Sequence, residues 1–245
     1  MRKIFIADAH LRNPEDENYR KLICFLKELK GNTDTLYILG DLFEFWIGFP
    51  GDPFPHYQPM LEQLRQLVSA GTELVFFEGN HDFHMGPFFR DTLNARIYRG
   101  PASVNIGEKL VYLCHGDQIN RSDKGYLMLR FMLHHNITRA IVPVFPVKIA
   151  TFIAGWMGRQ SKKGHGKRRA KWDYPAILRN FAAARFAEGY DAVISGHFHL
   201  PLFEQPIISG ERTLLSLGDW IHHFSYGEWD AGKFSLKIYA SNRAR

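Results

Sequence analysis

The chain is poor in cysteine and has no long uninterrupted apolar run. Its 245 residues include two cysteines, Cys24 and Cys114, both among apolar neighbours. Two cysteines cannot build a disulfide framework, so we expect buried, reduced thiols and a reducing, cytoplasmic compartment. About four apolar residues precede Asp8, too few for the apolar region of a signal peptide.

The sequence also lacks internal repeats and any linker rich in serine and glycine. One α/β domain over residues 1–245 is therefore the expected organisation, with ample length for a hydrophobic core. The apolar content of 45% and the charged content of 23% are ordinary for globular proteins, which excludes a disordered chain.

Five short apolar runs end in polar side chains. We expect the runs to be buried β-strands, and they cover residues 4–7, 36–39, 74–77, 110–114 and 192–195. Polar residues follow each run, and they are Asp8 and His10, Asp41, Asn80 to Asp82, His115, and His197 and His199. Open α/β sheets bind ligands at the carboxyl ends of their strands, so these side chains should lie together. Because oxygen and nitrogen donors of these kinds suit divalent cations, the pattern predicts a metal site.

Amphipathic helices are predicted between the first strands. Residues 18–30 and 56–70 carry apolar side chains at helical spacing, and glycine ends each segment. The β-α-β alternation favours parallel pairing with right-handed crossovers. After His199 the strand-like stretches 202–203, 213–216 and 234–239 predict a second, largely antiparallel sheet packed against the first.

About eighty residues separate His115 from His197, which is far longer than an ordinary connection between a strand and a helix. Residues 125–135 are predicted to be helical, and residues 137–157 are mostly apolar but too interrupted to span a bilayer. Seven basic residues follow: Arg159, Lys162, Lys163, Lys167, Arg168, Arg169 and Lys171. The 31 basic residues less these seven leave 24 against 25 acidic ones, so this segment accounts for the net charge of +6.

We interpret residues 120–172, roughly, as a helical cap inserted beside the metal site. Its basic residues would bind phosphate or anionic lipid, and its apolar surface would bind an acyl chain or a membrane. A simple solvated charged face is the alternative. Nucleic acid is not the expected partner, because no recognised nucleic-acid module accompanies the charge.

The strand-end motifs, in this order, resemble those of the calcineurin-like metallophosphoesterases. The motifs are Asp8-x-His10, Gly40-Asp41, Gly79-Asn80-His81-Asp82, His115 and Gly196-His197-x-His199. The resemblance implies a four-layer αββα sandwich of two mixed sheets with a helical cap insertion. It also implies two divalent metal ions, with Mn²⁺ expected first and Fe or Zn as alternatives.

The same resemblance implies a role for each ligand. Asp41 would bridge the two ions, one held with Asp8, His10 and His199 and the other with Asn80, His115 and His197. A hydroxide shared by the ions would then attack phosphorus in line.

Supporting residues are also implied. His81 would donate to a phosphoryl or leaving oxygen, and Asp82 would orient it. Glu44 and Asp117 would support the metal ligands from behind, or would be ordinary surface or turn carboxylates.

Within this superfamily the chain is most similar to the UDP-2,3-diacylglucosamine hydrolases of lipid A biosynthesis. The similarity is carried by residues 5–8, 37–44 and 46–48 and by cap positions. It implies cleavage of UDP-2,3-diacylglucosamine to UMP and 2,3-diacylglucosamine 1-phosphate by a peripheral protein on the inner face of the cell membrane. The residues implied to contact substrate are Asn80, His81, Asp123, Tyr126, Arg130, Ser161, Lys162, Lys167 and His197.

Three positions depart from the better-known hydrolases, which carry Arg, Leu and Thr where this chain has His81, Ala9 and Phe198. His81 instead matches the wider superfamily. Two alternatives therefore stay open: a related metallophosphoesterase acting on another phosphodiester or nucleotide, and a non-catalytic module that binds an anionic membrane or RNA. The complete ligand set argues against the second alternative.

Overall fold

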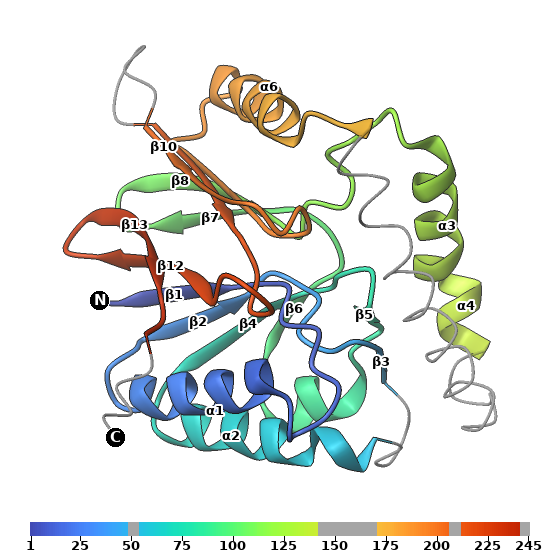
Figure 1. Cartoon of the computed structure of the whole chain (residues 1–245), viewed down its shortest axis with the longest axis vertical. Coiled ribbons are helices and arrows are strands. Elements are labelled where there is room, and N and C mark those ends of the chain that lie inside the picture. Colours follow the sequence, from blue (N-terminus) through green and yellow to red (C-terminus); the bar gives the residue numbers. More distant parts are fainter. Residues whose placement is uncertain (49–53, 142–170, 206–211, 241–245) are drawn as a thin grey trace.

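Two mixed β-sheets lie face to face between helices. The computed structural model describes residues 1–48, 54–141, 171–205 and 212–240. Helices α1 (Glu17–Leu29) and α2 (Gln58–Ser69) cover the outer face of one sheet, and α6 (Tyr174–Ala187) covers the outer face of the other (Figure 1). The predicted four-layer αββα architecture is confirmed.

The first sheet has the order β13-β12-β1-β2-β4-β6. Its strands are β1 (Lys3–Ile6), β2 (Thr35–Ile38), β4 (Glu73–Phe77), β6 (Arg96–Tyr98), β12 (Ser225–Asp230) and β13 (Lys233–Ile238). Strands β1, β2, β4 and β6 pair in parallel, as the β-α-β alternation predicts, while β12 pairs antiparallel with both β1 and β13. The carboxyl ends of β1, β2 and β4 therefore meet at one edge.

The second sheet has the order β10-β11-β9-β8-β7. Its strands are β7 (Ala102–Ile106), β8 (Lys109–Cys114), β9 (Ala192–Ser195), β10 (Pro201–Glu204) and β11 (Thr213–Leu217). Strand β9 pairs in parallel with both β8 and β11, and the edge strands β7 and β10 are antiparallel to their neighbours.

The prediction of a largely antiparallel second sheet from the strands after His199 is wrong. Strand β13 belongs to the first sheet, and β11 runs parallel to β9. The physical reason is that strand propensity predicts an element but not its partner, which depends on burial against distant residues. Five strands were also missed: β6, β7, β12, and the parallel pair β3 (Trp46–Ile47) and β5 (Asp82–Phe83).

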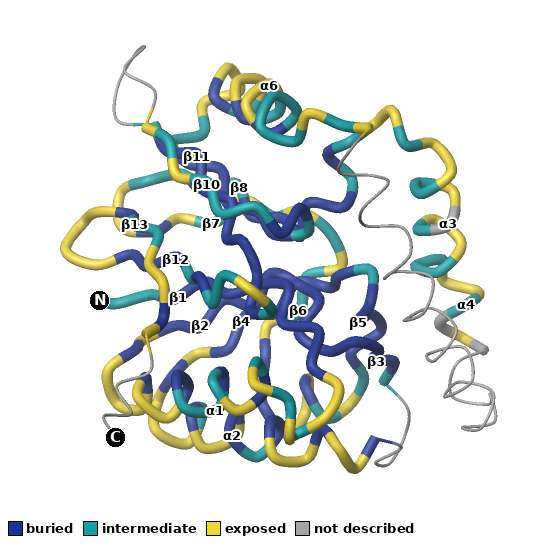
Figure 2. The backbone as a smooth tube through the Cα atoms, in the orientation of Figure 1, coloured by how far each residue is buried: buried dark blue, intermediate teal, exposed yellow. Residues whose placement is uncertain are grey.

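Strand β1 shows how the layers are held together. Ile4 and Ile6 pack toward α1 and α2, whereas Phe5 belongs to the core between the two sheets. Successive side chains of a strand point to opposite faces, so a sheet covered on both sides needs apolar residues at every position. Figure 2 shows this continuous burial along β1, β2 and β4.

The helices follow their apolar periodicity. In α1 the buried residues Leu22, Phe25, Leu26 and Leu29 recur at helical spacing. Asp173 caps the start of helix α6, because its side chain accepts the Ala176 N–H at 3.1 Å and so satisfies one free donor of the first turn.

The cap contributes α3 (Lys124–His134) and α4 (Asn136–Ile141), which stand at the side of the sandwich where β3 and β5 also lie (Figure 1). The helix predicted over residues 125–135 is confirmed. Of the seven basic residues, Lys171 is exposed and the other six lie outside the described residues. No helix among the described residues is both long and apolar enough to cross a bilayer.

Both cysteines are free thiols. Cys114 is buried as predicted, and burial raises the pKa of its thiol above the usual range. Cys24 is only half-buried.

Candidate metal centre

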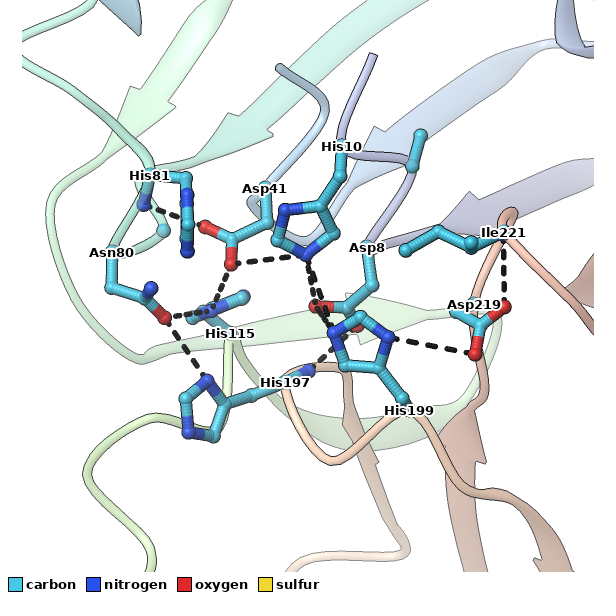
Figure 3. Close-up of polar contacts among 12 residues, drawn as sticks. Asp8, His10, Asp41, Asn80, His81, His115, His197, His199, Asp219 and Ile221 are labelled. Carbon is cyan, nitrogen blue, oxygen red and sulfur yellow. Dashed lines mark hydrogen bonds and ion pairs between the residues drawn. The ribbon is translucent and has the colours of Figure 1, made fainter. Parts of the chain in front are cut away.

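Five loops deliver the predicted ligands to one place. The loops follow β1, β2, β4, β8 and β9, so they come from the carboxyl ends of parallel strands in both sheets. Figure 3 shows the seven side chains pointing toward one another: Asp8, His10, Asp41, Asn80, His115, His197 and His199. The convergence that the strand-end pattern predicts is confirmed.

The first group of donors consists of Asp8, His10 and His199. The Nε2 atoms of His10 and His199 are 3.2 Å apart. Oδ1 of Asp8 lies 3.7 Å from the His199 Nε2 and 4.0 Å from the His10 Nε2. Three donor atoms at these separations could hold one divalent cation.

The second group consists of Asp41, His115 and His197, with Asn80 between the two imidazoles. Oδ1 of Asn80 lies 3.1 Å from the His115 Nε2 and 3.0 Å from the His197 Nδ1. Oδ2 of Asp41 lies 3.5 Å from the His115 Nε2. An amide oxygen, a carboxylate and two imidazoles thus face a common centre.

Asp41 connects the two groups. Its Oδ2 atom also lies 3.6 Å from the His10 Nε2, so one oxygen faces a histidine of each group. Its other oxygen accepts the backbone N–H of His81 at 2.9 Å, which fixes the orientation of the carboxylate.

Contacts on the outer side of three rings set the tautomers of His10, His115 and His199. Nδ1 of His115 lies 2.8 Å from the carbonyl oxygen of Leu39, which can only accept, so this nitrogen donates. Nδ1 of His199 faces Asp219 at 3.5 Å, and Nδ1 of His10 faces Glu44 at 3.5 Å. In neutral rings the Nε2 lone pairs then point inward, and those of His10 and His199 face each other across 3.2 Å.

Facing lone pairs repel unless a proton or a metal cation lies between them. The Oδ1 atom of Asp8 is buried and has no hydrogen-bond partner among the described residues, so it too is left for a positive charge. The donor set therefore fits a bound divalent metal ion. Histidines that ligate metals usually donate their other ring N–H to a carboxylate or a backbone carbonyl, as these rings can.

The pKa values reflect the same crowding of charge. Burial raises the pKa of Asp8 to about 7, against the lowering effect of His199 and His115. Burial lowers the pKa of His10 to about 4. Burial also lowers the pKa of His115, but the carboxylates of Asp41 and Asp8 outweigh it and raise that pKa to about 10.

Backbone strain is concentrated on the ligand loops. Positive φ angles occur at five of the ligand residues, which are Asp8, His10, Asp41, His197 and His199. Side-chain-bearing residues adopt this region rarely and at a cost, and such strain clusters at functional sites. The strain therefore supports a role for these loops in binding.

Gly40 is required where β2 turns into the site. Its φ is +84°, and a Cβ there would lie 2.5 Å from the His115 Nδ1 and 2.8 Å from the Gly79 Cα. No side chain fits between the two loops, which explains glycine before Asp41.

His81 and Asp82 play different structural parts. The ring of His81 is buried, with Nδ1 2.8 Å from the carbonyl oxygen of Glu44, and it stands nearly perpendicular to the His10 ring. The carboxylate of Asp82, predicted to orient His81, instead accepts the backbone N–H groups of Asp41 and Leu42 at 2.8 and 2.6 Å. The Glu44 carbonyl is thus the group that orients His81, and Asp82 shapes the loop that carries Asp41.

Glu44 contacts a predicted metal ligand, whereas Asp117 contacts residues of the cap. Glu44 faces His10, and although burial raises its pKa, His10, His81 and Arg12 lower it below the usual range. Asp117 forms an ion pair with Arg130 and accepts the Tyr126 hydroxyl at 3.5 Å.

Asp219 is a functional candidate that sequence reasoning missed. Its Oδ2 faces the His199 Nδ1, and its Oδ1 accepts the backbone N–H groups of Ile221 and His222 at 2.9 and 2.6 Å (Figure 3). Burial opposes the shift, but the hydrogen bond with His199 and those backbone groups lower the pKa of Asp219 far below the usual range. The signal was present, because Leu217-Gly218-Asp219 repeats Leu39-Gly40-Asp41.

The cap brings part of the predicted substrate-contact set to the centre. The Tyr126 ring lies 5.5 Å from the His197 ring, and Asp123 accepts the Tyr126 N–H at the start of α3. Arg130, one helical turn further on, pairs with Asp117. The other predicted contacts, Ser161, Lys162 and Lys167, lie outside the described residues.

Comparison with known proteins adds independent findings. A family model described as calcineurin-like phosphoesterase matches residues 1–201. The chain is 31% identical to UDP-2,3-diacylglucosamine hydrolase from Stenotrophomonas maltophilia, over 98% of this chain and 99% of that relative. It is 29% identical to the protein of the same name from Psychromonas ingrahamii, over 99% of each chain.

One solved structure supports the fold alone. An archaeal phosphodiesterase aligns with a TM-score of 0.50 and 15% identity, over 98% of this chain and 100% of that chain.

Proposed function

The chain belongs to the calcineurin-like phosphoesterase family, and from that premise we propose that it hydrolyses the pyrophosphate bond of UDP-2,3-diacylglucosamine. The products are UMP and 2,3-diacylglucosamine 1-phosphate, in a step of lipid A biosynthesis. One observation carries the proposal: the complete donor set lies in a protein that is similar over nearly its whole length to hydrolases of that name. The chain forms one phosphoesterase domain with the cap inserted in it.

Two divalent metal ions, Mn²⁺ before Fe or Zn, are the proposed cofactors. Asp8, His10 and His199 would hold one, and Asn80, His115 and His197 the other, with Asp41 shared. The mixed set of carboxylate, imidazole and amide donors suits these metals. Bound there, two ions would lower the pKa of a water molecule and neutralise phosphoryl charge.

The chain's own residues orient the reaction. His81 donates its Nδ1–H to the Glu44 carbonyl at 2.8 Å, so its Nε2 is the atom left to contact a phosphoryl or leaving oxygen, to which it donates when the ring carries both protons. Asp41 positions His81 through the backbone N–H, which couples the proposed donor to the shared metal ligand. Asp82 keeps the Asp41 loop in place through buried backbone hydrogen bonds.

The cap supplies the proposed contacts to the rest of the substrate. Tyr126, in the first turn of α3, lies beside His197, while Asp123 caps the helix and Arg130 lies in its second turn. The exposed face of α3 and α4 carries large apolar side chains at Met128, Phe131, Met132 and Ile137. An exposed apolar surface, in a chain that also carries the basic residues 159–171, suits an acyl chain and an anionic membrane, so a peripheral position on the inner membrane face, on the cytoplasmic side, is part of the proposal.

Product analysis tests the function directly. The purified, Mn²⁺-loaded protein would be incubated with UDP-2,3-diacylglucosamine and the products identified by mass spectrometry. UMP with 2,3-diacylglucosamine 1-phosphate is the expected result. Turnover of a generic phosphodiester with no cleavage of this substrate would move the assignment to another substrate of the same family.

A further inference from the structure

Arg12 lies at the rim of the metal centre because two loops run side by side. The Leu11 N–H donates to the Leu42 carbonyl, and the Glu44 N–H donates back to the Leu11 carbonyl, both at 3.0 Å. These bonds extend the parallel pairing of β1 and β2 beyond the strands themselves. The backbone thus fixes Arg12 beside Glu44.

The Glu44 carboxylate stands between Arg12 and the metal ligands. Its Oε1 lies 2.9 Å from an Nη atom of Arg12, and its Oε2 lies 3.5 Å from the His10 Nδ1. The carbonyl of the same residue holds the His81 ring. Glu44 therefore contacts the Arg12 guanidinium, the predicted ligand His10 and the ring of His81.

The ion pair joins one Nη atom of Arg12 to one carboxylate oxygen of Glu44. That oxygen is buried and has no other hydrogen-bond partner among the described residues. The Arg12 side chain is 40% exposed, against 11% for Glu44 and 6% for His10. A guanidinium carries five N–H groups, so one contact with Glu44 cannot use them all, and the exposed side chain keeps donors for a ligand at this rim.

A third metal ion is the competing interpretation of this corner. His10, Glu44 and His81 form a third group of donors close enough together to hold a cation. Arg12 already places a permanent positive charge 2.9 Å from that carboxylate, and the Nδ1 atom of His81 is hydrogen-bonded to a backbone carbonyl. The guanidinium of Arg12 therefore supplies the positive charge that a third metal ion would otherwise provide.

We propose that Arg12 binds the phosphate of a pyrophosphate substrate that is not attacked, and so favours pyrophosphates over simple phosphodiesters. This rests on the proposed function. The metal groups would neutralise the phosphate under attack, whereas the neighbouring phosphate needs a separate cation. Arginine suits that task because its planar fork can give two parallel N–H bonds to phosphate oxygens.

Binding of small anions to the Mn²⁺-loaded protein tests the role of Arg12. Arg12→Gln, Arg12→Lys and the control Arg65→Gln would be titrated by calorimetry with inorganic pyrophosphate and with inorganic phosphate. Arg65 is a comparable exposed arginine on α2, paired with Glu62. We expect Arg12→Gln to weaken pyrophosphate binding about tenfold to a hundredfold, the effect of losing a charged hydrogen bond, and to change phosphate binding little. Arg12→Lys should recover part of the loss, and Arg65→Gln should behave as the parent.

Other results would overturn the role of Arg12. Equal pyrophosphate affinity in Arg12→Gln and Arg65→Gln would show that Arg12 does not bind pyrophosphate. Loss of bound metal in Arg12→Gln, or equal weakening of pyrophosphate and phosphate binding, would show that Arg12 merely holds Glu44 and His10. If the parent protein does not cleave the diacyl UDP-sugar while pyrophosphate binding still depends on Arg12, the proposed function fails and the inference stands.

Discussion

The carboxylate of Asp41 accepts the backbone N–H of His81 at 2.9 Å through one oxygen and directs its other oxygen between the two histidine groups. A single side chain therefore orients the loop of the proposed proton donor and contributes to both candidate metal positions. This relationship makes Asp41 the residue whose loss should be felt most widely in the site.

Replacing Asp41 should empty both metal positions. Loss of a residue that supports a metal ligand typically lowers metal affinity or activity about 10–100-fold. We expect Asp41→Ala to lower both metal affinity and turnover by more than this, because Asp41 is itself a proposed ligand. Asp8→Ala is the comparison, and it should damage the group containing His10 and His199 more than the other. Metal analysis of the purified variants measures both effects. Two tightly bound ions in Asp41→Ala would refute its shared role.

Asp219 should matter through His199. We expect Asp219→Asn to weaken metal binding and turnover about 10–100-fold, because an amide holds the His199 tautomer less firmly than a carboxylate does. Asp191→Asn is a matched control, since Asp191 also accepts a backbone N–H, from Leu110 at 2.7 Å, at the other end of the second sheet. Metal titration and kinetics on both variants provide the measurement. Similar behaviour of the two variants would limit Asp219 to holding its own turn.

Gly40 should tolerate substitution far less than Gly31, which has a similar φ angle but open space around an added Cβ. Gly31 has φ +75° and nothing within 4 Å of an added Cβ, whereas Gly40 has φ +84° and the His115 ring in the way. Gly31→Ala should cost about 1–2 kcal/mol of unfolding free energy, the price of a left-handed side chain. Gly40→Ala should cost more and should also impair metal binding. Denaturant unfolding tests this, and equal costs would contradict the steric explanation.

His81 can be tested by removing and replacing its ring. His81→Ala should lower turnover about 10²–10⁴-fold while metal stays bound, because a positioned proton donor contributes about that much. His81→Arg should recover part of the activity toward the diacyl UDP-sugar if the position mainly binds phosphate charge. Kinetics with metal analysis distinguish these roles. Unchanged turnover in His81→Ala would remove the residue from the mechanism.

The basic segment is predicted to bind an anionic surface. Neutralising five of its basic residues should weaken the free energy of binding to anionic vesicles by about 1 kcal/mol for each charge near the membrane. The salt dependence of binding should also become flatter, because fewer screened charges take part. The variant would change Lys162, Lys163, Lys167, Arg168 and Arg169 to Gln. The control neutralises exposed charges elsewhere, at Lys27 on α1, Lys30 just after it and Arg65 on α2. Vesicle co-sedimentation is the assay, and equal binding by both variants would mean that the segment is only a solvated face.

The donor residues and most of the elements that carry them could be predicted from local pattern. Apolar runs followed by Asp, Asn or His describe β1, β2, β4, β8 and β9, and helical periodicity describes α1 and α2. Asp219 was missed although Leu217-Gly218-Asp219 has the same form as the Asp41 motif. It follows β11, a strand expected in an antiparallel sheet, whose end would not have met the others.

By itself, then, the sequence determined which chemical groups stand at the strand ends, because strand and turn preferences depend on neighbouring residues. The tertiary structure alone decided how those groups meet. Asp82 bonds to the Asp41 loop 41 positions away, and the His10 ring faces His199 across 189 positions. The placement of β12 beside β1, the inward nitrogen of each histidine and the exposure of Arg12 at the rim likewise depend on such distant contacts. Side-chain packing between segments far apart in the chain sets them, and no local pattern encodes it.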